Sequence, residues 1–320
     1  MARPLLKTSR AALPLLGLLM IACSEAPQDP PAQTIGDSVD PDDSPADDSR
    51  YEQNFVFASV TGDSVLLVPW LTHATAYRDQ TVRGARGWLA RSGAWDAFYA
   101  EEWTTPPTRA PTQILPYGNM RLLLQEGDIV DGIIFDDGTR RLELTFGDVT
   151  ANWSGPRGEV IDLVEGTAYI LDEEVEGLIL HLARASTNAT PLGGDWGMLV
   201  SGDSLQLVFA ANLEHGGEAD PLFRAWANIR QEERLWQEVR VSWEEVRAFP
   251  PARRDVPVSW LISSPDRSIE GQLEAISADI QPGTGLGPLL PVQALFEVAG
   301  DIYTEEGLFP VRGLLVHERR

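Results

Sequence analysis

The chain has one cysteine, Cys23, and one lysine, Lys7, among its 320 residues. A lone thiol cannot form a disulfide within the chain, and a zinc site built from several thiolates is excluded. Because the lysine lies in the N-terminal segment, the remaining chain cannot use a P-loop lysine or a Schiff-base lysine. The fold must therefore be stable through packing alone.

Positive charge is also scarce. The formal net charge is −23, and residues 51–320 contain 21 arginines and 40 acidic residues. Nucleic-acid binding needs clustered positive charge to meet the phosphates, so this balance argues against a nucleic-acid partner. The sequence gives no reason to expect a cofactor.

Long apolar runs are missing, with one short exception at residues 11–22. This run is too short to cross ~30 Å of hydrocarbon as a helix. It follows the positive residues Arg3, Lys7 and Arg10 and ends at Cys23. The segment resembles a bacterial lipoprotein signal peptide over residues 1–23, which implies a lipid anchor on Cys23. A plain secretory signal with an incidental cysteine is the alternative.

Residues 24–50 contain eight acidic side chains and five prolines. Such a segment cannot bury enough apolar area to offset its ordering entropy, so we expect a disordered tether. In lipoproteins of this kind, a residue other than aspartate after the cysteine usually accompanies outer-membrane sorting, and here Ser24 follows Cys23. We therefore expect a lipid-anchored protein of the bacterial cell envelope, at the outer membrane.

What the chain does contain is an internal repeat. The segment from Val60 to Val68 returns as Val200 to Val208, with a Gly-Asp-Ser turn in each. Tryptophans and histidines recur in pairs: Trp88 with Trp226, Trp95 with Trp236, Trp103 with Trp243, His73 with His215, and His181 with His317. A unit of this length is a whole domain rather than a solenoid repeat.

Each half shows the pattern of β-strands. Leu142, Leu144 and Phe146 alternate with polar residues, and residues 136–138 (Asp-Asp-Gly) are typical of a hairpin turn. Only residues 231–246 allow a competing helix. Eight or nine short strands per half predict an all-β protein of two tandem lipocalin-like β-barrels, or strongly curved sandwiches, related by internal duplication. We expect the domains at residues 51–190 and 195–320.

The closing strand of each half is apolar on both faces. Residues 175–182 and 311–317 have hydrophobic side chains at odd and even positions. A strand wetted on one side would carry polar residues there. We therefore expect each closing strand to be covered by its own barrel interior and by the other half. Gly177 and Gly313 would let a neighbouring backbone or ring approach closely.

The duplicated pattern resembles the tandem lipocalin-like proteins, a group that includes AttH, the carotenoid 1,2-hydratases and the fungal survival factors. The features that match are residues 55–68 and 195–208, the tryptophan-rich second quarter of each half, and the closing strands 175–184 and 311–320. This resemblance implies hydrophobic or isoprenoid ligands. No hydratase active site can be placed on the chain, so we assign no catalytic residue.

Gly202-Asp203-Ser204-Leu205 also spells the opening of a GDSL esterase. In that family the serine leaves a strand and enters a helix, whereas Ser204 is followed by the apolar stretch 205–209. A hairpin turn explains the duplicated motif better.

Histidines and tryptophans are the candidate ligand-binding residues. A histidine on an apolar strand more often packs than reacts, and large rings on strands more often fill a core than line a cavity. If the first and last strands of the first half pair antiparallel, His73 lies near Val175 and roughly 20 Å from His181, too far to share a metal. The candidates for ligand contact are His181, His317, Trp88, Trp226, Trp103, Trp243, His73 and His215.

These patterns favour a lipid-anchored protein that binds an apolar or amphiphilic small molecule without catalysis. A lipid- or isoprenoid-modifying enzyme of the carotenoid-hydratase-like group is one alternative. A surface module for protein or glycan contact is the other.

Overall fold

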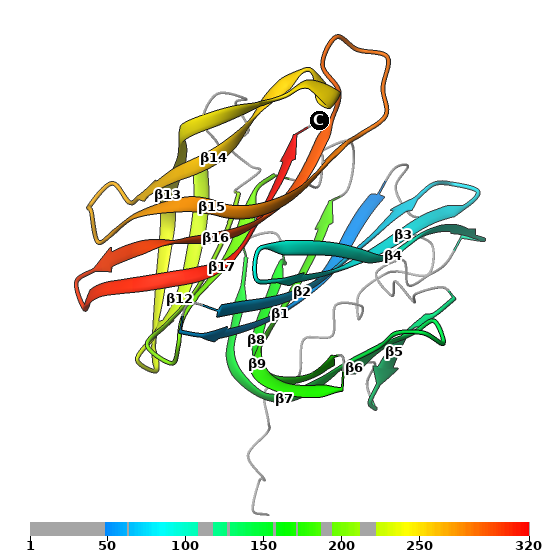
Figure 1. Ribbon diagram of the computed structural model, residues 1–320, viewed down its shortest axis with the longest axis horizontal. Coiled ribbons are helices and arrows are strands. Elements are labelled where there is room, and N and C mark those ends of the chain that lie inside the picture. The colour runs from blue at the N-terminus through cyan, green and yellow to red at the C-terminus, as the bar shows by residue number, and fades with distance from the viewer. Residues whose placement is uncertain are drawn as a thin grey trace, which may run out of the picture. The chain divides into compact units, whose positions relative to one another are not determined.

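The computed structural model describes residues 49–62, 64–107, 118–126, 129–155, 158–170, 172–186, 194–211 and 222–319. Within these ranges the chain forms β-strands and one short 3₁₀ turn, η2 (Pro250–Ala252), as Figure 1 shows. No helix in the same ranges has the length and apolar character needed to cross a bilayer. The predicted all-β fold class is confirmed.

The first sheet has nine strands, in the spatial order β4-β3-β2-β1-β9-β8-β7-β6-β5. Their bounds are β1 (Ser49–Thr61), β2 (Ser64–Ala76), β3 (Thr81–Arg91), β4 (Ala94–Thr105), β5 (Met120–Leu124), β6 (Val130–Asp136), β7 (Arg141–Ser154), β8 (Val160–Ile170) and β9 (Glu173–Ser186). Strand β1 begins two residues inside the stretch expected to be a tether, and Ser49 is buried.

The second sheet is a closed barrel of eight strands in sequence order. They are β10 (Trp196–Ser201), β11 (Leu205–Ala211), β12 (Leu222–Ile229), β13 (Glu232–Phe249), β14 (Arg254–Ser263), β15 (Ile269–Pro282), β16 (Val292–Thr304) and β17 (Gly307–Arg319). The segment that could have been a helix lies in β13. There Val239 and Val241 are buried while Arg240 and Ser242 are exposed, which is the two-residue period of a strand.

The first sheet is nearly closed rather than closed. Its edge strands, β4 and β5, do not pair with each other. The sheet still curls on itself, because Phe98 of β4 packs on Phe135 of β6 with ring centroids 4.9 Å apart. On the surface, Arg140 Nη1 lies 2.7 Å from Asp96 Oδ2, linking the β6–β7 turn to β4.

Turn residues explain where the strands reverse. Gly62 and Gly202 adopt φ values of +59° and +50°, a region that favours glycine. In the predicted hairpin at residues 136–138, the Asp137 carboxylate accepts hydrogen bonds from the backbone N–H groups of Thr139 and Arg140. These contacts are the local side-chain bonds that make aspartate a turn former.

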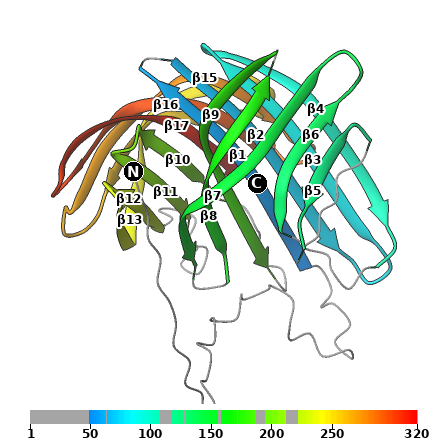
Figure 2. The same cartoon turned by 90° about the horizontal axis from the view of Figure 1, so that it is seen from below.

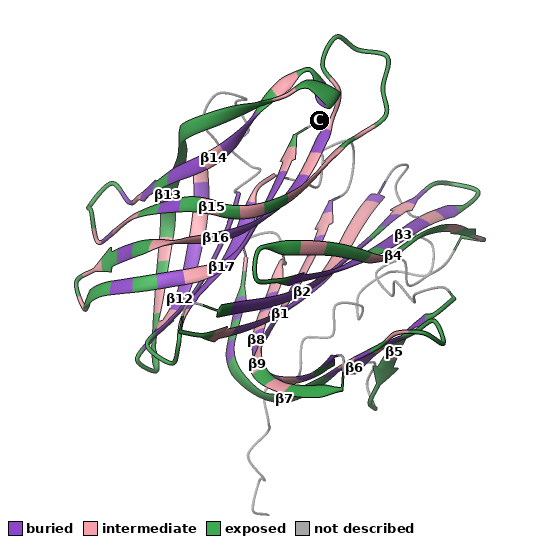
Figure 3. Ribbon diagram, viewed as in Figure 1, coloured by how far each residue is buried: buried purple, intermediate pink, exposed green. Residues whose placement is uncertain are grey.

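Three hydrophobic clusters hold the fold together. One fills the barrel, with Phe209, Trp260 and Phe296 among its buried members. A second lines the inside of the curled first sheet. The third joins the two sheets, and Figure 3 shows the buried strands where they meet. Strands β1 and β2 contact β17, and β4 contacts β15 (Figure 2).

The closing strands are covered on both faces, as predicted. In β9, Ile179 packs inside the first sheet, whereas Leu180 joins the cluster between the sheets. In β17, Leu315 faces the barrel interior, whereas Leu314 joins the cluster between the sheets. Added Cβ atoms at Gly177 and Gly313 would meet the carbonyl oxygens of Ala58 and Met198 respectively, so the predicted close approach of backbone is confirmed.

Candidate functional site

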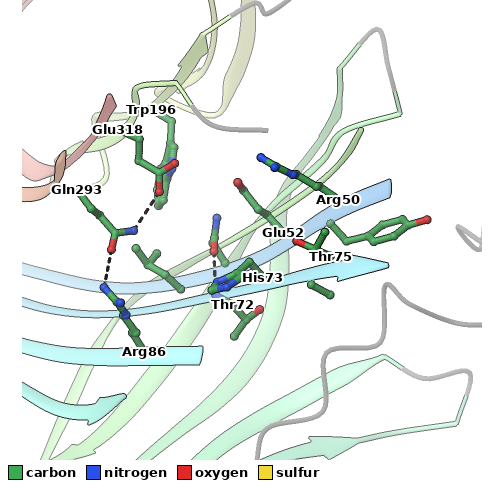
Figure 4. A pocket seen from close by; sticks show the side chains of 13 residues that line it. Arg50, Glu52, Thr72, His73, Thr75, Arg86, Trp196, Gln293 and Glu318 are labelled. Carbon is green, nitrogen blue, oxygen red and sulfur yellow. Dashed lines mark hydrogen bonds between the residues drawn. The ribbon is translucent and has the colours of Figure 1, made fainter. Parts of the chain in front are cut away.

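A cavity of about 240 Å³ lies where the two sheets meet, and it is the best candidate site (Figure 4). Its walls come from the first sheet and from the barrel. The lining residues are Arg50, Tyr51, Glu52, Asn54, Leu71, Thr72, His73, Ala74, Thr75, Arg86, Trp196, Gln293 and Glu318.

Strand periodicity explains why polar groups gather here. Arg50, Glu52 and Asn54 alternate along β1 on the same face as Val56 and Ala58. Val56 and Ala58 belong to the apolar cluster between the sheets, whereas the three polar residues line the cavity. The cavity is therefore the polar end of the contact between the two sheets.

The negative charge of Glu52 is already compensated. The Arg184 guanidinium donates to Glu52 Oε2 through Nη2 at 2.5 Å and through Nε at 3.1 Å. Both side chains are largely buried, 3% exposed for Arg184 and 11% for Glu52. This charge-assisted fork fixes the carboxylate at the cavity wall.

A series of hydrogen bonds through two glutamine side chains holds the opposite wall of the cavity. Arg86 Nη1 donates to Gln281 Oε1 at 3.2 Å and to Gln293 Oε1 at 3.0 Å. Gln293 Nε2 in turn donates to Glu318 Oε1 at 3.0 Å. These contacts run from β3 of the first sheet to β15, β16 and β17 of the barrel, so the two sheets build the site together.

Arg50 differs from these residues. It is half-buried at the cavity wall, and it makes no hydrogen bond or ion pair with any other residue that the structure describes. A cation that has lost part of its hydration without gaining a partner can bind an anionic group. Leu71 and Trp196 also line the cavity, but both side chains are buried, at 8% and 1% exposure.

His73 is the candidate histidine that the structure places in this cavity. It lies opposite Glu52 in the β1–β2 register, and Glu52 lies opposite Arg184 in the β1–β9 register. An added Cβ at Gly84 would collide with the imidazole, so glycine makes room for the ring on β3. The prediction that His73 lies near Val175 is wrong, because β2 continues to Ala76 alongside the start of β1, at the opposite end of β9.

His181 and His317 have structural partners. The imidazole of His181 stacks on Phe55 with centroids 4.7 Å apart, and its Nδ1 lies 3.0 Å from Asp162 Oδ2. His317 is 2% exposed, and its Nδ1 lies 2.8 Å from Asp195 Oδ1. Neither lines the cavity between the sheets.

The candidate tryptophans lie in four different settings. Trp88 is buried between the sheets and donates from Nε1 to Asp279 Oδ2 at 2.7 Å. Trp103 packs against the inner cluster of the first sheet. Trp226 lines a second cavity of about 10 Å³, and Trp243 is 37% exposed beside His317. None of the four lines the larger cavity, and their part in ligand binding stays a prediction.

Two predicted residues, His215 and Cys23, lie outside the described residues. Among the residues that are described, no group of three or more His, Cys, Asp or Glu side chains could hold a metal ion.

Four residues of the cavity were not predicted from the sequence: Arg50, Arg86, Gln293 and Glu318. One signal was present at residues 50–54, where polar side chains alternate on a face that becomes apolar from residue 56 onward. Such a change along one face of a strand marks the edge of a buried contact.

No protein-family model matches the chain, and no curated protein sequence matches it. Among solved structures, the chain resembles a protein of Nitrosomonas europaea assigned as an AttH. The TM-score is 0.57 at 11% identity, over 85% of this chain and 94% of that one. The chain shares the fold of that Nitrosomonas europaea protein. At this level of identity, the likeness to AttH shows the fold alone.

Two further solved structures match with lower scores. Kievitone hydratase from Nectria haematococca has a TM-score of 0.48 at 10% identity, over 85% of this chain and 89% of that one. CghA has a TM-score of 0.43 at 12% identity, over 84% of this chain and 88% of that one. Both scores are too low to carry an argument about function.

Proposed function

We propose that the protein binds the anionic head group of an amphiphilic small molecule in the cavity between the sheets, without catalysis. The observation that supports this function is the half-buried guanidinium of Arg50 in the cavity wall, unpaired among the described residues. A cavity of about 240 Å³ suits a head group and the first part of a chain rather than a whole long-chain lipid.

Two terms contribute to the binding free energy. Apolar surface of the ligand that becomes buried in the cavity contributes ~25 cal/mol per Å². A charge-assisted hydrogen bond from Arg50 contributes about 1.5–3 kcal/mol. Glu52 does not cancel the charge of Arg50, because its carboxylate is already held by Arg184.

In this proposal, residues 1–23 direct the chain to the envelope, Cys23 carries the lipid anchor, and the segment from residue 24 to 48 is the tether up to β1, which begins at Ser49. The cavity would then meet ligands close to a membrane surface, where amphiphiles concentrate.

Calorimetric titration with decanoate, and with decanol as its uncharged match, tests the proposal. We expect the wild-type chain to bind decanoate more tightly than decanol. Arg50→Gln should weaken decanoate binding about tenfold, because ~1.4 kcal/mol corresponds to a factor of ten, and should leave decanol unchanged. Arg91→Gln is the control, since Arg91 lies outside the cavity and pairs with Glu173 at 2.8 Å. Equal affinity for both probes would reject head-group recognition.

One observation favours a second candidate function, enzymatic modification of such an amphiphile. His73 lines the cavity opposite Glu52, and imidazole acts as a general acid or base near neutral pH. Incubating decanoate with wild type and His73→Ala, followed by mass spectrometry of the decanoate, separates the two functions. A mass change in the ligand that depends on His73 supports the enzyme, and an unchanged mass supports binding.

A further inference from the structure

The barrel has an exposed apolar loop at the end where the chain terminates. The loop joins β15 to β16, and Figure 1 shows it projecting beyond the sheet near the C-terminus. Leu286 is fully exposed, at 108% of its reference area, and Leu289 is 53% exposed. While these two leucines face water, they contribute no hydrophobic stabilisation to the folded state.

The loop is nevertheless held in place. Arg253 Nη1 donates to the carbonyl oxygens of Gly287 at 3.3 Å and Pro288 at 3.5 Å. The backbone N–H of Leu290 donates to Ala252 O at 3.0 Å. The leucines are therefore presented on a braced loop whose base is the β13–β14 turn.

Two arginine side chains lie at the base of this loop. Arg254 follows the bracing residue Arg253, and its Nε is buried without a hydrogen-bond partner among the described residues. Arg319 lies opposite Val292 on β16, and Leu290 is hydrogen-bonded to Ala252, so the ends of β17 and of the β13–β14 turn come together. The pKa of Arg254 is lowered, first by burial and then by repulsion from Arg319. Acidic residues far outnumber basic ones in this chain. Arg254 and Arg319 nevertheless form no ion pair with any other residue that the structure describes.

An aromatic ring completes the surface. The Arg319 guanidinium lies over the Trp243 ring, 4.9 Å from its centroid, and the ring is 37% exposed. A partly exposed tryptophan is suited to the boundary between water and lipid, and so is an arginine, which has an apolar stem and a charged tip.

We propose that this end of the barrel docks on an anionic phospholipid bilayer. Leu286 and Leu289 enter the acyl boundary, and Arg254 and Arg319 meet the lipid phosphates. Charge complementarity selects a bilayer over a neutral protein surface, because neighbouring cations without acidic partners fit a plane of negative charge. The acidic remainder of the chain does not prevent docking, since its charges are screened beyond a Debye length of ~8 Å. This surface lies in a different place from the cavity between the sheets and does not depend on that cavity's function.

Hydrogen exchange on the full chain tests the docking surface, because it reports the loop locally whatever the N-terminal segment does. The chain is mixed with phosphatidylcholine vesicles containing about one-third phosphatidylglycerol, or with pure phosphatidylcholine vesicles. We expect amides of residues 283–291 to exchange at least about threefold more slowly with the anionic vesicles only. Leu286→Asp and the pair Arg254→Gln, Arg319→Gln should each remove this protection.

Matched controls lie elsewhere on the barrel. Leu308→Asp introduces the same charge at another exposed leucine, 51% exposed, in the β16–β17 hairpin. Arg267→Gln removes an exposed arginine from the β14–β15 turn. Both should keep full protection of residues 283–291. Unchanged exchange of the loop with anionic vesicles, or protection that survives Leu286→Asp, would overturn the proposal.

Discussion

His317 and His181 occupy the same position relative to the first strand of their sheets but take their carboxylates from opposite sides. His181 lies between Phe55 on β1 and Asp162 on β8. His317 lies beside Ala294 on β16, and its carboxylate, Asp195, immediately precedes β10. The pairing of histidine with carboxylate is kept in both halves, but the strand that supplies the carboxylate differs.

These two pairs should differ in their effect on stability. His317 is 2% exposed, so Asp195→Asn replaces the charged acceptor of a buried Nδ1 with a neutral amide oxygen and should cost about 1–2 kcal/mol. The side chains of His181 and Asp162 are 20% and 22% exposed, so Asp162→Asn should cost ~1 kcal/mol or less. Urea denaturation of both variants gives the comparison. A larger loss for Asp162→Asn would contradict the assignment.

Two tryptophans donate hydrogen bonds across the contact between the sheets, Trp88 to a charged acceptor and Trp95 to a neutral one. We expect the bond from Trp88 to contribute more to the free energy of unfolding. Trp88 Nε1 donates to the Asp279 carboxylate at 2.7 Å, and Trp95 Nε1 donates to Ser277 Oγ at 3.0 Å. Trp88→Phe should cost about 1.5–3 kcal/mol and Trp95→Phe about 0.5–1.5 kcal/mol. A double-mutant cycle with Asp279→Ala measures the first bond. A coupling energy near zero between positions 88 and 279 would show that the bond does not hold the sheets.

The turn at Asp266 should titrate at low pH. Hydrogen bonds from Ser264, then from the Ser268 side chain and backbone, lower the pKa of Asp266 from 3.8 to about 2. Because the folded pKa is lower than the unfolded one, the contribution to stability is complete above pH 3.8 and is lost as the pH falls through about 2. NMR titration of the carboxyl carbon measures this pKa, which Ser264→Ala should raise. An Asp266 midpoint near 3.8 in the wild type would be inconsistent with these hydrogen bonds.

Gly84 should be needed for the shape of the cavity between the sheets. An added Cβ there would collide with the His73 imidazole, so Gly84→Ala should push the ring away from β3. We expect decanoate affinity to change at least about threefold, with ~1 kcal/mol or less of destabilisation because a side chain can shift. Gly62→Ala is the comparison. No atom lies within 4 Å of its added Cβ, but the φ of +59° makes alanine strained there. Gly62→Ala should lower stability and leave affinity intact, and the reverse pattern would contradict this role for Gly84.

The fold was predictable because its signals are local or repeated. Leu142 and Leu144 alternate with polar residues, the Asp137 turn contains its own hydrogen bonds, and the apolar closing strands indicated burial on both faces. The incomplete closure of the first sheet was not predictable, because no short-range pattern says whether β4 and β5 will pair.

The cavity between the sheets was not predictable for a related reason. Arg86 meets Gln293 across 207 residues of sequence, and that meeting depends on how two whole sheets pack. His73 was a candidate from the repeat, but its neighbours followed from the extent of β2, which the sequence pattern had left too short. Arg50 belongs to no recognisable sequence motif. It is a candidate because its side chain is half-buried and has no partner among the described residues.

A crystal structure of the full chain with decanoate tests the central claim most directly. We expect the carboxylate to lie within hydrogen-bonding distance of the Arg50 guanidinium, with the alkyl chain inside the cavity between the sheets. A ligand inside the barrel, or one in the cavity between the sheets whose carboxylate points away from Arg50, would contradict it.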